Sequence, residues 1–164
     1  MRIRHLNVLN SFFSRSFLCA LVLMPHLIWA ATNERLPIPR FASLRSSEVN
    51  LRRGPGTQYP LDWVFVRAGL PVEIISEFET WRQIRDVDGT QGWVHQSMLS
   101  GKRTAMTMPS GSVLPLKHAP EENARVLALL EPGAQGTILS CKGRWCRVQF
   151  GSYKGWLMRT QFWG

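Results

Sequence analysis

The sequence has few of the residues from which catalytic and metal centres are built. Its 164 residues include only three cysteines and four histidines, and no Ser, His and Asp stand in an order that indicates a catalytic triad. No glycine-rich loop precedes a helical pattern, which excludes the usual phosphate-binding signature. We therefore expect no enzymatic activity, no catalytic residue, no bound metal and no cofactor.

Acidic residues are absent from the N-terminal segment, which instead has three arginines, an apolar run over residues 17–24, and the small residues Ala30 and Ala31. This order is typical of a secretory signal peptide. The run is shorter than the about 20 apolar residues of a membrane-spanning helix. We predict a signal peptide over residues 1–30, cleaved after Ala30, and a periplasmic or secreted protein. The alternative is that this segment is retained as an anchor, which would be the one membrane contact we expect.

Acidic residues are also absent after Glu131. Removal of residues 1–30 leaves 17 of the 20 Lys and Arg residues against all 11 Asp and Glu residues, a net charge of +6. This excess predicts a basic face that attracts an anionic partner, such as cell-wall carboxylates, an acidic glycan, lipid headgroups or an acidic protein. The expected compartment argues against nucleic acid, and a merely solvated surface is the alternative. The cations beyond Glu131 are Lys142, Arg144, Arg147, Lys154 and Arg159.

Two cysteines remain after residue 30, in the motif CKGRWC (residues 141–146). In an oxidising compartment two cysteines make one bridge, so we predict a structural disulfide between Cys141 and Cys146. A zinc site would need two further ligands, for which only His95 and His118 are available. A redox-active pair more often has two intervening residues at the start of a helix, whereas these cysteines flank a predicted hairpin.

An internal repeat covers most of the remaining chain. Several residues recur at a spacing of 64, and the motif GWV at residues 92–94 recurs as GWL at 155–157, at a spacing of 63. Small changes of spacing over a whole unit are typical of a duplication with altered loops. The recurring pairs are Gly69 and Gly133, Ile74 and Ile138, Ser76 and Ser140, Trp81 and Trp145, and Ile84 and Val148.

Within each unit the pattern is that of short β-strands. Apolar, branched and aromatic residues form short runs bounded by Gly, Pro, Asp or Ser, and Asp88 and Gly89 stand where a tight hairpin needs positive φ. A helix over residues 121–130 is the alternative there, but the aligned stretch of the first unit is β-rich and holds Pro60. We predict an all-β protein of two tandem small antiparallel barrels, with residues 1–30 as signal peptide, 31–45 as linker, and domains at 46–103 and 107–164.

The first unit resembles a bacterial SH3-like domain over its full length. The residues that carry the resemblance are VNLRRGP (49–55), the Tyr59-Pro60 pair, a tryptophan before a strand, and GWV before Leu99. The second unit is divergent, because Ala119 replaces Gly54 and no tyrosine-proline pair follows. The resemblance implies a non-enzymatic binding module that acts at the cell wall on peptidoglycan or an associated protein. The alternative is an accessory subunit that packs on a periplasmic enzyme or membrane complex and has no ligand groove.

Six residues are the candidates for ligand binding. Four belong to the first unit and two to the tip of CKGRWC: Arg52, Arg53, Tyr59, Trp81, Lys142 and Arg144. We expect the repeated tryptophans to be core or partly buried, with a groove that stacks on a sugar or peptide as the alternative. Glu77 and Arg82 occupy the positions of the two cysteines in the first unit, so we expect an ion pair there, of small value if exposed.

Overall fold

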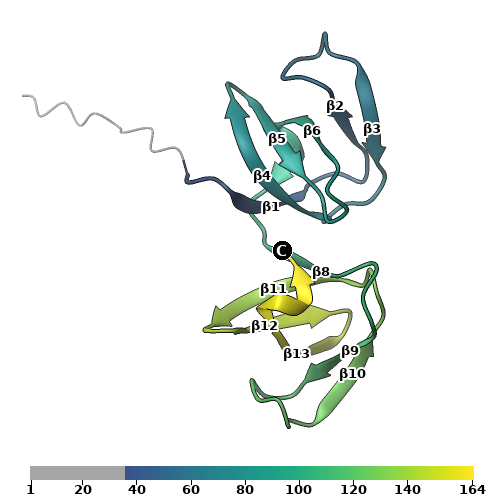
Figure 1. Cartoon of the computed structure of the whole chain (residues 1–164), viewed down its shortest axis with the longest axis vertical. Coiled ribbons are helices and arrows are strands. Elements are labelled where there is room, and N and C mark those ends of the chain that lie inside the picture. The colour runs from purple at the N-terminus through teal and green to yellow at the C-terminus, as the bar shows by residue number, and fades with distance from the viewer. Residues whose placement is uncertain (1–35) are drawn as a thin grey trace, which may run out of the picture. The chain divides into compact units, whose positions relative to one another are not determined.

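The computed structural model describes residues 36–164, which form two seven-stranded antiparallel sheets in tandem (Figure 1). Each sheet also has one short 3-10 turn before its last strand. The first sheet comprises β1 (Arg40–Leu44), β2 (Val49–Arg52), β3 (Leu61–Phe65), β4 (Pro71–Phe78), β5 (Trp81–Arg85), β6 (Gln91–His95), η1 (Gln96–Met98) and β7 (Leu99–Ser100). The second comprises β8 (Thr104–Thr107), β9 (Leu114–Lys117), β10 (Val126–Leu130), β11 (Gln135–Lys142), β12 (Trp145–Phe150), β13 (Tyr153–Met158), η2 (Arg159–Gln161) and β14 (Phe162–Trp163).

The two sheets have the same topology. The strand order is β3-β2-β6-β5-β4-β1-β7 in the first and β10-β9-β13-β12-β11-β8-β14 in the second, so each strand has its counterpart seven places later. The long strands β4 and β11 have the same shift of register, between Ile74 and Ser76 in β4 and between Ile138 and Ser140 in β11. The predicted all-β class and the predicted duplication are therefore confirmed.

Each barrel has its own core, built by strand alternation. Because successive side chains of a strand point to opposite faces, alternate residues are buried in several strands, as at Cys146, Val148 and Phe150 of β12. The first core contains Leu51, Val72, Ile84 and Val94, and the second contains Leu116, Cys146, Val148 and Leu157. These cores fix the inner face of each sheet and leave the opposite face for function.

The glycine of each GW motif is required by close packing. A Cβ atom at Gly92 would lie 2.5 Å from Cγ of Leu51, and one at Gly155 would lie 2.6 Å from Cγ of Leu116. Real Cβ atoms do not approach other atoms so closely. The repeated glycine therefore lets β6 and β13 approach the leucine of the neighbouring strand.

The predicted hairpin at Asp88 and Gly89 is confirmed. β5 and β6 pair in register from Trp81 with His95 to Arg85 with Gln91. Gly89 has φ 89°, and Oδ1 of Asp86 accepts hydrogen bonds from the backbone N–H groups of Asp88 and Thr90. The rejected helix over residues 121–130 does not form, and Val126–Leu130 of that stretch make up the strand β10.

Some boundaries differ from those expected. Residues 40–44, which we placed in the linker, form β1 and pair with β4, and the second sheet begins at Thr104, ahead of residue 107. Both strands are defined by pairing with residues distant in the sequence, which local patterns do not report. The predicted signal peptide lies outside the described residues, and within residues 36–164 there is no helix with the length and hydropathy to cross a membrane.

Candidate binding groove of the first barrel

A groove of about 240 Å³ opens on the first barrel. It lies between β2, the start of β5, the end of β6 and the loop of residues 53–60. Two of the predicted site residues, Arg52 and Trp81, line it. The full lining is Glu48, Asn50, Arg52, Thr57, Trp81, His95 and Met98.

Strand pairing places the two rings of the groove together. Trp81 and His95 are opposite each other in the β5–β6 ladder, and their rings meet edge to face with centroids 5.5 Å apart. Nδ1 of His95 lies 2.7 Å from Oγ of Ser97 and accepts from the Ser97 N–H at 3.3 Å. Nε2 is therefore the ring nitrogen that remains for a ligand.

Arg52 holds the front loop in shape. One of its terminal nitrogens donates to the backbone oxygens of Thr57, at 3.1 Å, and Tyr59, at 2.8 Å. A Cβ atom at Gly54 would lie 2.4 Å from the Tyr59 ring, so the glycine is needed for that ring to pack on the loop. Part of the family motif thus has a structural role.

The other predicted residues of the first unit lie at the edge of the groove or beyond it. Tyr59 is 40% exposed and is not among the lining residues. Arg53 is exposed, and its Nε donates to the Asp62 carboxylate at 2.8 Å. Sequence reasoning missed Glu48 and treated His95 as an ordinary strand-end residue. The pairing of His95 with Trp81 across the predicted hairpin was the signal that could have identified it.

The groove carries charges of both signs. Glu48 is exposed, and Arg52 lies across the same groove. A carboxylate, a guanidinium, an imidazole and a tryptophan ring together can bind a ligand that has an amine, a carboxylate and an apolar part.

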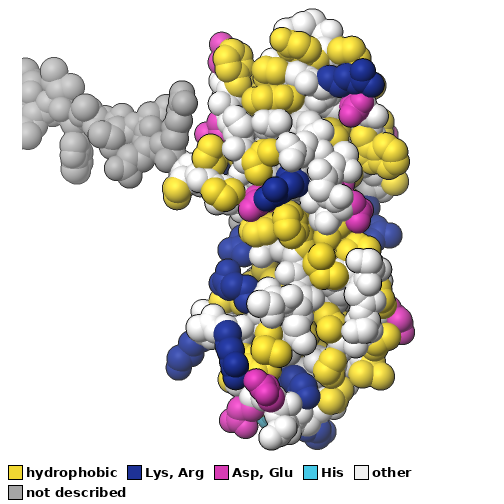
Figure 2. All heavy atoms as spheres, viewed as in Figure 1, with side chains coloured by type: hydrophobic (Ala, Val, Ile, Leu, Met, Phe, Trp, Pro, Cys, Tyr) yellow, Lys and Arg dark blue, Asp and Glu magenta, His cyan; other side chains and the backbone are white. Residues whose placement is uncertain are grey.

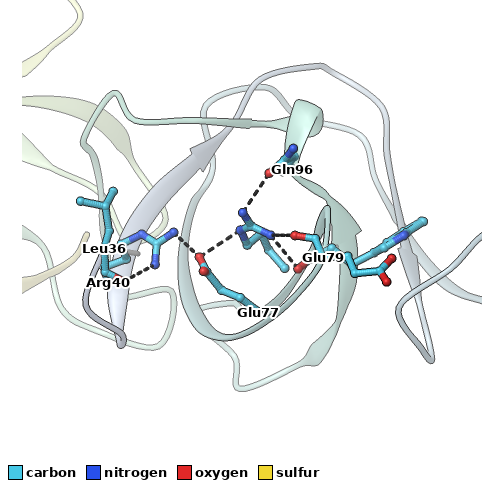
Figure 3. Close-up of polar contacts among 7 residues, drawn as sticks. Leu36, Arg40, Glu77, Glu79 and Gln96 are labelled. Carbon is cyan, nitrogen blue, oxygen red and sulfur yellow. Dashed lines mark hydrogen bonds and ion pairs between the residues drawn. The ribbon is translucent and has the colours of Figure 1, made fainter. Parts of the chain in front are cut away.

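A half-buried ion cluster supports the start of β5 beside the groove (Figure 3). Nε of Arg82 lies 3.0 Å from the Glu77 carboxylate, which also binds Arg40. Arg82 further donates to the side chain of Gln96 and the backbone oxygen of Glu79, both at 2.8 Å. The expected pair between Glu77 and Arg82 is confirmed, but it is not exposed, because the two side chains are only 12% and 16% accessible.

The second barrel has a disulfide at the corresponding position. Cys141 and Cys146 face each other in the β11–β12 ladder and are joined by a disulfide bond. The predicted disulfide is therefore confirmed. Lys142 and Arg144 flank the hairpin tip and are exposed. Arg144 is paired with the exposed Glu122 at 3.0 Å, so part of the positive charge at this tip is neutralised.

Three polar groove residues, Glu48, Asn50 and His95, are not repeated in the second barrel, whereas Arg52 is repeated as Lys117. In the alignment of the two repeats, Val113 occupies the position of Glu48, and Pro115 occupies the position of Asn50. Met158 stands for His95 and faces the equivalent tryptophan, Trp145. Trp145 is also buried, at 7% exposure, whereas Trp81 is partly exposed. The groove with ionisable groups therefore belongs to the first barrel.

Comparison with solved structures found distant similarities. The solved structures similar to this chain include NlpC1 from Trichomonas vaginalis, at 11% identity and a TM-score of 0.36 over 79% of this chain and 47% of that one. An NlpC/P60 family protein from Bacillus cereus has 13% identity and a TM-score of 0.34, over 75% and 55% of the two chains. The chain thus spans about half the length of these structures. A comparison with curated proteins found no match.

The family is identified by sequence. The family model described as "Bacterial SH3 domain" matches residues 45–101 and again residues 111–164. The first region contains β2 to β7 and the second contains β9 to β14, so each lacks only the first strand of its sheet, and together they cover more than half of the chain. The chain therefore belongs to the bacterial SH3 domain family and carries two copies of that domain.

Proposed function

We propose that this protein is an exported, non-enzymatic binding protein of the cell wall, which recognises peptidoglycan, or a protein bound to it, through the first-barrel groove. The exposure of Trp81 in the groove and of Tyr59 beside it carries the proposal. Tyr59 is 40% exposed and Trp81 is partly exposed. In a barrel with only a scaffold role, we would expect these rings to be buried together in the core.

The chemistry of the groove favours the peptide part of peptidoglycan. Wall peptides present amines, carboxylates and small apolar side chains within a few residues. Glu48 can pair with an amine, Arg52 and His95 can bind a carboxylate, and the Trp81 ring offers an apolar surface. Membership of the bacterial SH3 domain family supports a binding role.

The direct test is a pull-down with purified sacculi at low salt. The variant Glu48→Val/His95→Met installs the residues that the second barrel carries at these positions, so it removes two of the groove's ionisable groups with little risk to folding. We expect retention at least about tenfold weaker than wild type, equivalent to about 1.4 kcal/mol. The control Arg67→Gln, an exposed residue outside the groove, should bind as wild type. Equal retention of all three proteins would contradict the groove, and no retention of wild type would contradict the wall ligand.

A second candidate function is that of an accessory subunit on a periplasmic enzyme or membrane complex. Strand β3 favours it, because it is an edge strand on which Leu61, Trp63 and Val64 are 50%, 59% and 37% exposed. An exposed apolar edge is a template for strand addition by a protein partner. The variant Val64→Lys distinguishes the two functions. Loss of a co-purifying protein with unchanged binding to sacculi would favour the subunit role.

A further inference from the structure

On the outward face of the second barrel, a tryptophan has a cation on either side. On β12 and β13, Cys146, Val148 and Leu157 are fully buried, so the alternate residues Arg147 and Trp156 lie on the outer face. Arg147 is opposite Trp156, and Trp156 is opposite Lys117 of β9. The three residues therefore form one row across three neighbouring strands, about 10 Å from end to end.

A further cation lies beside this row. Lys154 pairs with Gln149 in the same ladder and lies two residues before Trp156 on the same face. We call Lys117, Arg147, Lys154 and Trp156 the basic row. Trp156 is partly exposed, and Arg147 and Lys154 are exposed.

The positive charge of the basic row is largely uncompensated. None of the ion pairs among residues 36–164 involves Arg147 or Lys154, and no acidic residue follows Glu131 in the sequence. The nearby carboxylate of Glu122 pairs with Arg144 instead. Nζ of Lys117 donates to the backbone oxygen of Glu122 at 2.9 Å, which holds that cation in place. Figure 2 shows several Lys and Arg side chains over the barrel that β8 to β14 form.

The first barrel has the same tryptophan without the same cations. There, Trp93 is opposite Gln83 and Arg52. Gln83 takes the place of Arg147, and Gln91 takes the place of Lys154. Arg85, opposite Gln91, is a further cation on the first barrel's outer face, but it is paired with Glu73. The outer faces of two barrels that share topology and register therefore differ in uncompensated positive charge. This difference in charge favours an anionic ligand at the second barrel.

We propose that the basic row binds an acidic polysaccharide. The partly exposed Trp156 ring can stack on the C–H face of a sugar ring, since the negative face of the indole attracts weakly positive C–H groups. Cations on both sides of the ring can then pair with carboxylates of successive sugars. A lipid surface fits less well, because Trp156 is half-buried within the sheet, whereas an aromatic residue that enters a bilayer projects from the surface. This site is independent of the first-barrel groove.

The test measures binding of the protein, purified as the cell makes it, to polygalacturonate at low salt. Dextran supplies sugar rings without charge, poly-L-glutamate supplies carboxylates without sugar rings, and phosphatidylglycerol vesicles supply an anionic membrane. We expect polygalacturonate to bind about tenfold or more tightly than poly-L-glutamate at equal charge, with no binding of dextran. Preference for the vesicles, or equal binding of the two carboxylated polymers, would overturn the proposal.

Variants locate the site. Arg147→Gln/Lys154→Gln installs the residues of the first barrel and should weaken polygalacturonate binding about tenfold or more. The control Arg67→Gln/Lys102→Gln removes the same charge from exposed positions elsewhere and should change binding less than about threefold. Trp156→Leu should weaken binding of polygalacturonate but not of poly-L-glutamate, and Trp93→Leu is its matched control. Equal effects of the two charge variants would contradict a site at the basic row. Unchanged polygalacturonate binding by Arg147→Gln/Lys154→Gln would also contradict it, whatever the binding to sacculi.

Discussion

At the scale of single residues, the two barrels stabilise the same hairpin position by different means. The first uses Glu77 between Arg40 and Arg82, and the second uses the bond between Cys141 and Cys146. The closed loop of the disulfide is short, so the chain-entropy model gives it only about 2 kcal/mol. The ion cluster matters because its carboxylate is mostly withdrawn from water. Removal of that carboxylate leaves two half-buried guanidinium groups without their partner.

We therefore predict that Glu77→Ala destabilises the protein by about 1–3 kcal/mol, the usual cost of half-buried polar groups left unpaired. Urea unfolding measures this. The control is Asp62→Ala, which breaks the exposed pair with Arg53 and should cost less than about 1 kcal/mol. A similar cost for the two variants would show that the Glu77 cluster behaves as an ordinary surface pair.

At the scale of elements, the GW motif is a packing device at the crossing of two strands. Gly92 and Gly155 each admit a core leucine, and the tryptophan that follows each glycine lies on the outer face. The same strand thus supplies the close approach that the core needs and the aromatic surface that a ligand needs.

Alanine at Gly92 tests this packing. Its Cβ atom would lie 2.5 Å from Leu51 Cγ and 3.0 Å from the backbone oxygen of Arg52, so we expect a loss of about 1–3 kcal/mol, as for other overpacked cores. Thermal unfolding measures the loss. Gly101→Ala is the control, because nothing lies within 4 Å of the added atom, and it should melt as wild type. If Gly92→Ala also melts as wild type, the close approach does not constrain the motif.

Much of the arrangement of strands and turns was predictable from the sequence. The alternation of apolar residues, the Asp88 and Gly89 turn and the repeat of Trp81 as Trp145 are local or periodic signals, and they predicted the strands and the duplication. Strand β1 was missed because it is defined by pairing with β4, about 30 residues away. The groove was predicted in part: Arg52 and Trp81 carry the family motif, whereas Glu48 and His95 become neighbours of these residues only when the sheet forms.

At the scale of the whole molecule, the duplication has produced two barrels with one topology and different surfaces. The first has Glu48 and His95 in its groove, whereas the second has Val113 and Met158 at these positions and carries a disulfide and a row of cations. The two copies therefore share a fold and differ in the chemistry of their surfaces.

We also predict that the whole protein is exported and processed. Mass spectrometry of the protein isolated from its cells should give a chain that begins at Ala31 and has no free thiol. The reason is that a signal peptidase would remove Cys19 with residues 1–30 and the oxidising compartment would bond the remaining two cysteines. Two free thiols, or a chain that still begins at Met1 and fractionates with the cytoplasm, would contradict export.

Chemical-shift mapping can show whether the first-barrel groove binds a wall peptide. Soluble peptides released from sacculi are titrated into the isotopically labelled protein, and the amide and imidazole signals are followed. We expect saturable shifts for Glu48, Arg52, Trp81 and His95, and their loss in the Glu48→Val/His95→Met variant. Shifts confined to other residues, or no shifts at any peptide concentration, would contradict binding in this groove.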